Sequence, residues 1–118
     1  MSLLHDAFAR AKSENRAALI AYLPAGYPTE DGAVECIAAM VEGGVDIVEI
    51  GFPYSDPVMD GPTIQDAVNI SLEGGTKSAT VINTVKRVAD LGVPALVMSY
   101  WNPIERYGLD SFASDFHA

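Results

Sequence analysis

The chain has 118 residues, 49% apolar and 19% charged, a composition typical of one globular domain and not of a disordered or fibrous protein. Its formal net charge of −9 disfavours nucleic acids and anionic membrane surfaces as partners. The longest apolar stretch, residues 17–23, is far shorter than the roughly 20 residues of a membrane-spanning helix. The first residues lack the basic segment and apolar run of a signal peptide, so we expect a cytoplasmic protein without membrane contact.

The first half of the chain predicts a helix, a strand, a second helix and a second strand. Apolar residues at helical spacing indicate an opening helix over residues 3 to about 15, and residues 18–23 form an apolar strand. Thr29 is placed to cap a helix with an acidic first turn, which ends at two glycines, 43 and 44. The second strand, residues 45–50, is almost entirely apolar, as expected for a parallel strand buried on both faces.

The second half repeats the pattern. Pro62 is suited to the first turn of a helix that ends at Gly74, and a further helix spans residues 80–91. The third strand is expected at residues 95–100. A last helix begins near Asp110 and runs to the final residue without a terminating signal, which we interpret as a cut and not a natural terminus.

Alternating strands and helices indicate an α/β protein built from three βα units around a parallel sheet. None of the strands alternates between apolar and polar residues, so both faces of the sheet should be covered, and the third strand should need a neighbour. A doubly wound sheet is complete at about this size. A (β/α)8 barrel needs roughly 250 residues. Under that alternative, most of the other five βα units of the barrel are missing from these residues.

The second strand carries two acids with different expected roles. Side chains alternate along a strand, which puts Glu49 on the same face as Ile47 and Asp46 on the opposite face. A carboxylate on an apolar face at the C-terminal end of a strand is partly desolvated, which suits it to proton transfer; a salt-bridged glutamate is an equal alternative from position alone. Asp46 begins the strand. Residues at the N-terminal end of the strands in a parallel sheet usually serve stability and not catalysis, so we expect a structural role for Asp46.

A proline-rich loop, residues 52–62, follows that strand at the face where parallel α/β folds bind ligands. Prolines restrict the loop and lower the cost of holding an acid over a substrate. Composition alone favours an exposed turn for Asp56 and leaves Asp60 open between a turn and a site residue. Four residues near strand ends either line an aromatic pocket or pack against neighbours, and these are Tyr22, Met98, Tyr100 and Trp101.

No metal site is predicted, because the two histidines lie near opposite ends of the chain and the single cysteine has no companion ligand. Cys36 is expected to be a small packing residue within a helix. No glycine-rich nucleotide-binding motif is present.

Three motifs resemble the tryptophan synthase alpha chain family. They are Leu23-Pro24-Ala25-Gly26-Tyr27-Pro28, Val48-Glu49-Ile50-Gly51-Phe52-Pro53-Tyr54-Ser55-Asp56-Pro57, and Asp60-Gly61-Pro62-Thr63-Ile64-Gln65. They occur in order, and Met98-Ser99-Tyr100-Trp101-Asn102-Pro103 resembles the family's third strand and the loop behind it. The resemblance covers essentially the whole chain.

The resemblance implies a partial TIM barrel: an N-terminal helix and about the first three βα units, with residues 1–118 as the N-terminal part of a single domain. It implies a lyase of tryptophan biosynthesis that splits indole-3-glycerol phosphate into indole and glyceraldehyde 3-phosphate by a retro-aldol reaction. Glu49 would be the general acid and base and Asp60 the partner carboxylate that binds the indole N–H. Tyr22, Met98 and Tyr100 would line the indole pocket, with Tyr22 in place of the family's phenylalanine.

The resemblance also implies a partner. Pro53, Asp56 and Pro57 would face a tryptophan synthase beta subunit in an α2β2 tetramer, and the pyridoxal phosphate cofactor would belong to that subunit, with none in this chain. Phosphate-binding loops of such barrels follow the seventh and eighth strands, so we expect these residues alone to be inactive. Two alternatives are another phosphate-handling biosynthetic barrel and a non-enzymatic α/β module that binds through its open edge.

Overall fold

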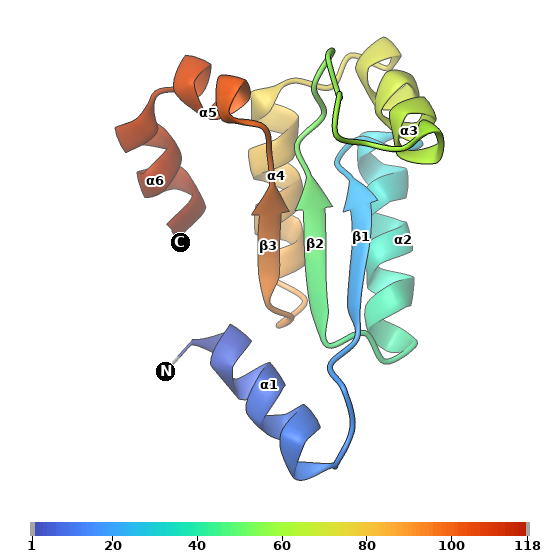
Figure 1. Ribbon diagram of the computed structural model, residues 1–118, viewed down its shortest axis with the longest axis vertical. Coiled ribbons are helices and arrows are strands. Elements are labelled where there is room, and N and C mark those ends of the chain that lie inside the picture. The colour runs from blue at the N-terminus through green and yellow to red at the C-terminus, as the bar shows by residue number, and fades with distance from the viewer. Residues whose placement is uncertain (1, 118) are drawn as a thin grey trace.

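The computed structural model describes residues 2–117 as strands alternating with helices (Figure 1). No helix in this range is long and apolar enough to cross a membrane. The elements, in chain order, are α1 (Leu3–Ser13), β1 (Ile20–Pro24), α2 (Glu30–Glu42), β2 (Ile47–Gly51), α3 (Pro62–Glu73), α4 (Ser78–Ala89), β3 (Ala95–Met98), α5 (Trp101–Tyr107) and α6 (Leu109–His117).

The three strands form one parallel sheet in the order β1-β2-β3, so β2 is central and β1 and β3 are the edges of the described sheet. The register places Tyr22 of β1 beside Glu49 of β2, and Glu49 beside Leu96 of β3. All three strands end at the same side of the molecule, where the loops that carry the predicted site residues begin (Figure 1).

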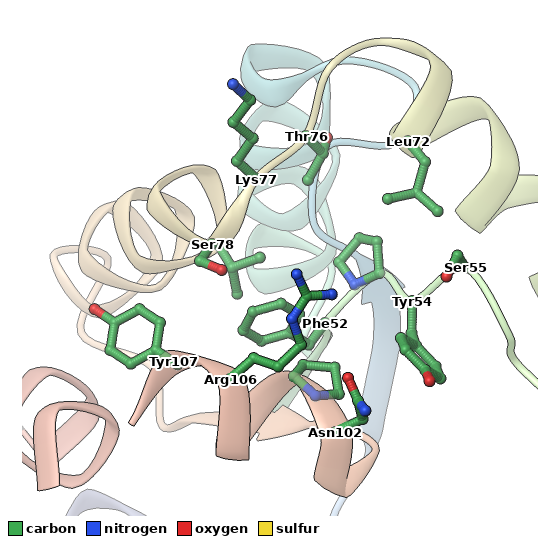
Figure 2. A pocket seen from close by; sticks show the side chains of 13 residues that line it. Phe52, Tyr54, Ser55, Leu72, Thr76, Lys77, Ser78, Asn102, Arg106 and Tyr107 are labelled. Carbon is green, nitrogen blue, oxygen red and sulfur yellow. The ribbon is translucent and has the colours of Figure 1, made fainter. Parts of the chain in front are cut away.

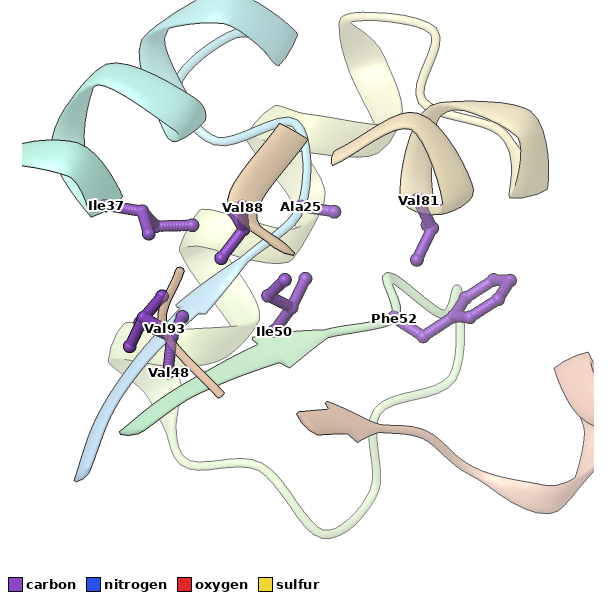
Figure 3. Close-up of a cluster of buried hydrophobic side chains, with 8 residues drawn as sticks. All are labelled: Ala25, Ile37, Val48, Ile50, Phe52, Val81, Val88 and Val93. Carbon is purple, nitrogen blue, oxygen red and sulfur yellow. The ribbon is translucent and has the colours of Figure 1, made fainter. Parts of the chain in front are cut away.

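The hydrophobic core lies between the sheet and helices α2 and α4, which cover one face (Figures 1 and 3). Each fully buried isoleucine or valine contributes about 1.5–3 kcal/mol through loss of apolar surface to water. The fully enclosed members include one residue of α2, two of β2 and two of α4, which are Ile37, Val48, Ile50, Val81 and Val88.

The opposite face of the sheet carries Glu49 and is only partly covered. By the register, Ile20, Leu96 and Met98 share this face with Glu49, and these three apolar side chains are all exposed. The prediction that both faces are covered therefore fails within residues 2–117, where helices α2 and α4 cover one face.

The predicted elements are confirmed within about three residues at their ends, and the third strand ends at Met98, two residues early. Helix α5 was not predicted. The aromatic pair at residues 100 and 101 suggested a longer strand, whereas Pro103 is compatible with the first turn of a helix, whose N–H groups lack intrahelical partners. The prediction for Cys36 is wrong: its side chain is exposed on α2, beside the buried stripe.

Asp46 is a structural residue, as its position at the start of β2 predicted. It is buried, and its carboxylate accepts hydrogen bonds from both Arg16 Nη atoms (2.7 and 2.9 Å), from Arg10 Nη2 (3.1 Å) and from the Leu19 amide (2.8 Å). The Arg16 guanidinium and the Leu19 amide hold the pKa of Asp46 well below its usual range. This cluster fastens α1 and the segment after it to the sheet.

We expect Asp46→Asn to destabilise the fold most at neutral pH. A carboxylate whose pKa is lowered by folding stabilises the native state above its unfolded pKa of about 4, and this contribution is lost as the pH falls below that value. The difference in Tm between the chain and the variant should therefore be several degrees at pH 7 and shrink in acid. Thermal unfolding followed by circular dichroism measures it.

The matched control is Asp31→Asn, which also removes a carboxylate paired with an arginine. The Asp31 side chain is 80% exposed and pairs with Arg87 at 2.7 Å on the surface. An exposed pair contributes about 0–1 kcal/mol, so the control should change Tm little. Equal effects of the two substitutions at all pH values would contradict a special role for Asp46.

Candidate functional site

Glu49 lies at the C-terminal half of the central strand, on the face opposite the core. It is partly buried, and its strand neighbours on that face are Tyr22 and Leu96. The residue two positions later on the same face is Gly51, and the space above it is occupied by the end of the Tyr22 side chain. The strand therefore presents one carboxylate toward the end of the sheet where ligands bind in parallel α/β folds.

Asp60 is held in place by hydrogen bonds of the loop that precedes α3. Its amide donates to the Pro57 carbonyl (3.1 Å), and its own carbonyl accepts from Gln65 Nε2 (2.8 Å). The amide of Met59 donates to the Tyr100 hydroxyl (2.9 Å), which ties the loop to the end of β3. The backbone of this turn is thus fixed from α3 and β3, and the Asp60 carboxylate is left free of these bonds.

Helix α3, which follows Asp60, is in turn fixed to the end of β1. The Ser71 hydroxyl is fully buried and donates to the Ala25 carbonyl (2.6 Å). It also contacts the Thr76 hydroxyl at 2.8 Å. A Cβ atom at Gly26 would collide with both hydroxyls, and Gly26 has a positive φ of 78° that favours glycine. Helix α3, which follows the Asp60 loop, is therefore held near its C-terminal end to the segment after β1.

A small cavity of about 220 Å³ opens beside Asp60. Of the four strand-end residues considered for an aromatic pocket, Tyr22, Met98 and Tyr100 line this cavity together with the acid. Trp101 does not line it and is exposed. Glu49 is not among the lining residues, although it neighbours Tyr22 in the sheet. The cavity is lined by Tyr22, Phe52, Met59, Asp60, Met98, Ser99 and Tyr100.

The Tyr22 side chain leans across the sheet from β1 to β2. A Cβ atom added to Gly51 would overlap the Tyr22 hydroxyl and the end of its ring. Because Gly51 follows Glu49 on the same face, the tyrosine ring covers the space directly beyond Glu49. A side chain at position 51 would therefore require the end of the Tyr22 ring to move.

Two carboxylates act on Tyr22 at once. Burial raises the pKa of Tyr22 to about 12, and the negative charges of Asp60 and Glu49 add to the rise, with a further contribution from Tyr100. Tyr22 is consequently neutral at physiological pH and keeps its proton. Glu49 and Asp60 are therefore both close enough to Tyr22 for their charges to raise its pKa.

The residues predicted to face a partner lie on the loop 52–61 but differ in exposure. Asp56 is exposed, Pro57 is partly exposed and Pro53 is buried. Pro53 lines a larger hollow of about 560 Å³ between this loop, the start of α4 and α5. Figure 2 shows the Arg106 side chain in this hollow between Phe52 and Asn102.

Sequence analysis missed the residues that hold the loop. Gln65 and Met59 stand within or beside the quoted motifs, yet nothing in their spacing revealed that one binds the Asp60 carbonyl and the other binds Tyr100. The hydrogen bond accepted by the Tyr100 hydroxyl was also not predicted, because Tyr100 was considered only as a pocket-lining or packing residue. Among residues 2–117, no three histidine, cysteine or acidic side chains cluster in a way that would hold a metal ion.

A profile described as "Tryptophan synthase alpha chain" matches residues 8–118. Curated proteins of the same description from Thermobifida fusca and Streptomyces coelicolor are 53% and 54% identical over 100% and 98% of this chain. The aligned regions make up only 44% and 43% of those proteins, so the chain spans less than half of their length.

Solved structures agree with these relatives. Tryptophan synthase from M. tuberculosis in its aminoacrylate-bound form superposes with a TM-score of 0.94 at 47% identity, over 99% of this chain and 48% of that one. The alpha subunit of tryptophan synthase from Legionella pneumophila gives a TM-score of 0.93 at 32% identity, over 99% of this chain and 45% of that one. The predicted fold, an N-terminal helix and three βα units of a TIM barrel, is confirmed.

Proposed function

Because the chain belongs to the tryptophan synthase alpha chain family, we propose that a full-length alpha chain carrying these residues cleaves indole-3-glycerol phosphate to indole and glyceraldehyde 3-phosphate. One observation supports this most directly: Glu49 is the strand neighbour of Tyr22, and Tyr22 and Asp60 line the same small, mainly apolar cavity at the C-terminal end of the sheet. That is the end at which TIM barrels perform chemistry.

In the proposed reaction, Glu49 is the general acid and base. It protonates the indole carbon that bears the glycerol side chain and accepts the proton of the adjacent hydroxyl as the carbon–carbon bond breaks. Its side chain is partly buried on the incompletely covered face of β2, which supports a carboxylate that meets a substrate above the sheet. One carboxyl group can serve both transfers, since it gains one proton and gives up another.

Asp60 supplies the electrostatic part of the mechanism. As the indole carbon is protonated, positive charge develops on the ring, and a fixed carboxylate hydrogen-bonded to the ring N–H stabilises it. The loop bonds from Gln65 and Met59 support this role, because they pre-order the turn that carries Asp60 and so reduce reorganisation during the reaction. Tyr22, Met98 and Tyr100 are proposed to enclose the indole ring.

The proposal includes a beta subunit of tryptophan synthase as partner in an α2β2 tetramer. Asp56 is exposed and Pro57 is partly exposed, and both belong to the loop whose earlier residues, Pro53 among them, line the hollow in Figure 2. Arg106 in that hollow forms no ion pair with residues 2–117, which leaves a cation available to a partner. The alpha chain needs no cofactor in this scheme, and pyridoxal phosphate acts in the beta subunit. The cytoplasmic location stays a prediction.

We further propose that residues 1–118 are the N-terminal part of a single TIM-barrel domain. Later strands would pair with the edge of β3 and enclose the face on which Ile20, Leu96 and Met98 are exposed. The loops after the seventh and eighth strands would bind the substrate phosphate. Residues 1–118 alone therefore lack the phosphate contacts of the proposed substrate.

Indole release from indole-3-glycerol phosphate tests the proposal. We expect turnover by a full-length alpha chain that carries residues 1–118 of this sequence, and no release above background by residues 1–118 alone. Gel filtration with a beta subunit checks the proposed tetramer in the same preparation. A binding module would instead retain a partner without any dependence on Glu49 or Asp60.

A further inference from the structure

The turn that carries Asp60 is held by two side chains from outside it. The turn runs from Pro57 to Asp60 and is closed by the bond from the Asp60 amide to the Pro57 carbonyl (3.1 Å). Tyr100 binds the middle of the turn, where its hydroxyl accepts a hydrogen bond from the Met59 amide. Gln65, near the start of α3, binds the main chain of residue 60 itself.

One amide group of Gln65 joins the two ends of the turn. Its Nε2 donates to the Asp60 carbonyl at 2.8 Å and makes a longer contact of 3.4 Å with the Pro57 carbonyl. Both neighbours are carbonyl oxygens, which only accept hydrogen bonds, so the NH2 end of the side chain must face the turn. The side chain is partly buried, which limits competition from water for these contacts.

Gln65 is mounted on a helix that is itself fixed to the sheet. Its own amide donates to the Gly61 carbonyl (3.0 Å), and further along α3 the buried Ser71 hydroxyl donates to the Ala25 carbonyl just after β1. Helix α3 also packs on β1, the strand beside the one that carries Glu49. The clamp therefore sets the position of the Asp60 main chain relative to the sheet.

The placement of Gln65 separates it from the residues that meet a ligand. Asp60 lines the 220 Å³ cavity, whereas Gln65 does not. Any effect of Gln65 on a ligand in that cavity must therefore pass through the turn. The hydrogen bonds that hold residue 60 involve its main chain, so the direction of its carboxylate follows from the position of that main chain.

We propose that Gln65 is a positioning residue: its amide fixes the main chain of Asp60 and thereby aims the carboxylate at the N–H group of the substrate ring. This inference rests on the proposed lyase function. A carboxylate fixed in advance stabilises the developing positive charge without reorganising during the reaction. A turn released from the clamp loses part of that advantage, because small displacements of a catalytic group are costly.

The kinetic test is Gln65→Met in the full-length alpha chain, which keeps the length of the side chain and removes the donor. We expect kcat to fall roughly 10–100-fold, the scale of a displacement of about 1 Å in a site. KM should change less, because Asp60 acts mainly on the charge of the transition state. The matched control is Asn69→Leu, which removes an exposed amide one turn along α3 and should leave both constants unchanged.

A double substitution tests whether Gln65 acts through Asp60. In an Asp60→Asn background, Gln65→Met should lower kcat almost no further, because two residues that act through one contact are not additive. A purely structural role would instead lower kcat by the same factor in both backgrounds. Losses that multiply would overturn the proposal.

Amide hydrogen exchange supplies a readout without activity. In the full-length alpha chain, Gln65→Met should speed exchange of the Met59 and Asp60 amides, because the turn opens at a lower free energy. The amides of β2 should stay protected, which shows that the fold is intact, and Asn69→Leu should change neither set. Unchanged exchange in the turn would refute the clamp.

The outcomes separate the two proposals. If Glu49→Gln abolishes indole release while Gln65→Met keeps the kcat of the unsubstituted enzyme, the positioning role is refuted and the lyase function stands. If the unsubstituted full-length chain releases no indole, the lyase function fails together with any role of Gln65 in it. Amide exchange then still decides whether Gln65 orders the turn.

Discussion

Glu49→Gln in a full-length alpha chain carrying these residues is expected to lower the rate of indole release by about 10²–10⁴-fold. The amide has the size of the carboxylate but neither gives nor accepts a proton at neutral pH. Glu49 lies on the face of β2 away from the core, so the substitution should leave the fold intact. Steady-state kinetics with indole-3-glycerol phosphate gives the rate, and thermal unfolding checks the fold.

A matched control is Glu42→Gln at the end of α2, where the side chain is exposed. This variant changes the net charge by the same amount and should retain full activity. Substantial turnover by Glu49→Gln would remove Glu49 from the mechanism. A large loss in both variants would instead indicate that the reaction responds to overall charge.

Asp60→Asn is expected to lower kcat by roughly 10²–10³-fold, the loss typical of removing one preorganised electrostatic contact in a transition state. Asparagine still presents an oxygen to the indole N–H, so ground-state binding and KM should change less than kcat. The loop should keep its shape, because its hydrogen bonds involve the main chain of residue 60 and not its carboxylate.

The control for this prediction is Asp66→Asn, one turn along α3 at an exposed position. It should leave kcat and KM unchanged. An Asp60→Asn enzyme with normal kcat and a raised KM would show that Asp60 binds the substrate without stabilising charge in the transition state. The crystal structure of the variant would confirm that the loop is retained.

The sequence was sufficient for those parts of the molecule that depend on local patterns. Helix boundaries close to those observed followed from the glycine pairs, a capping threonine and Pro62 at a first turn. Side-chain alternation correctly placed Glu49 on the face of β2 opposite Val48. The role of Asp46 followed from its position at the start of a strand. Each of these inferences uses residues that are neighbours along the chain.

Contacts between residues far apart in the sequence could not be predicted from such patterns. The bond from Met59 to Tyr100 joins residues 41 positions apart, and no periodicity predicts it. Helix α5 was missed because aromatic residues at its start also favour a strand, and only the tertiary setting decides between them. The family resemblance supplied the roles of Glu49 and Asp60, which composition alone had left open.

The overlap between Tyr22 and the space above Gly51 constrains how these two positions can change during evolution. A side chain at position 51 would force the end of the Tyr22 ring to move, so it is accommodated more easily when position 22 carries a smaller residue. The two sites, one on each of two adjacent strands, are therefore expected to covary across homologous chains.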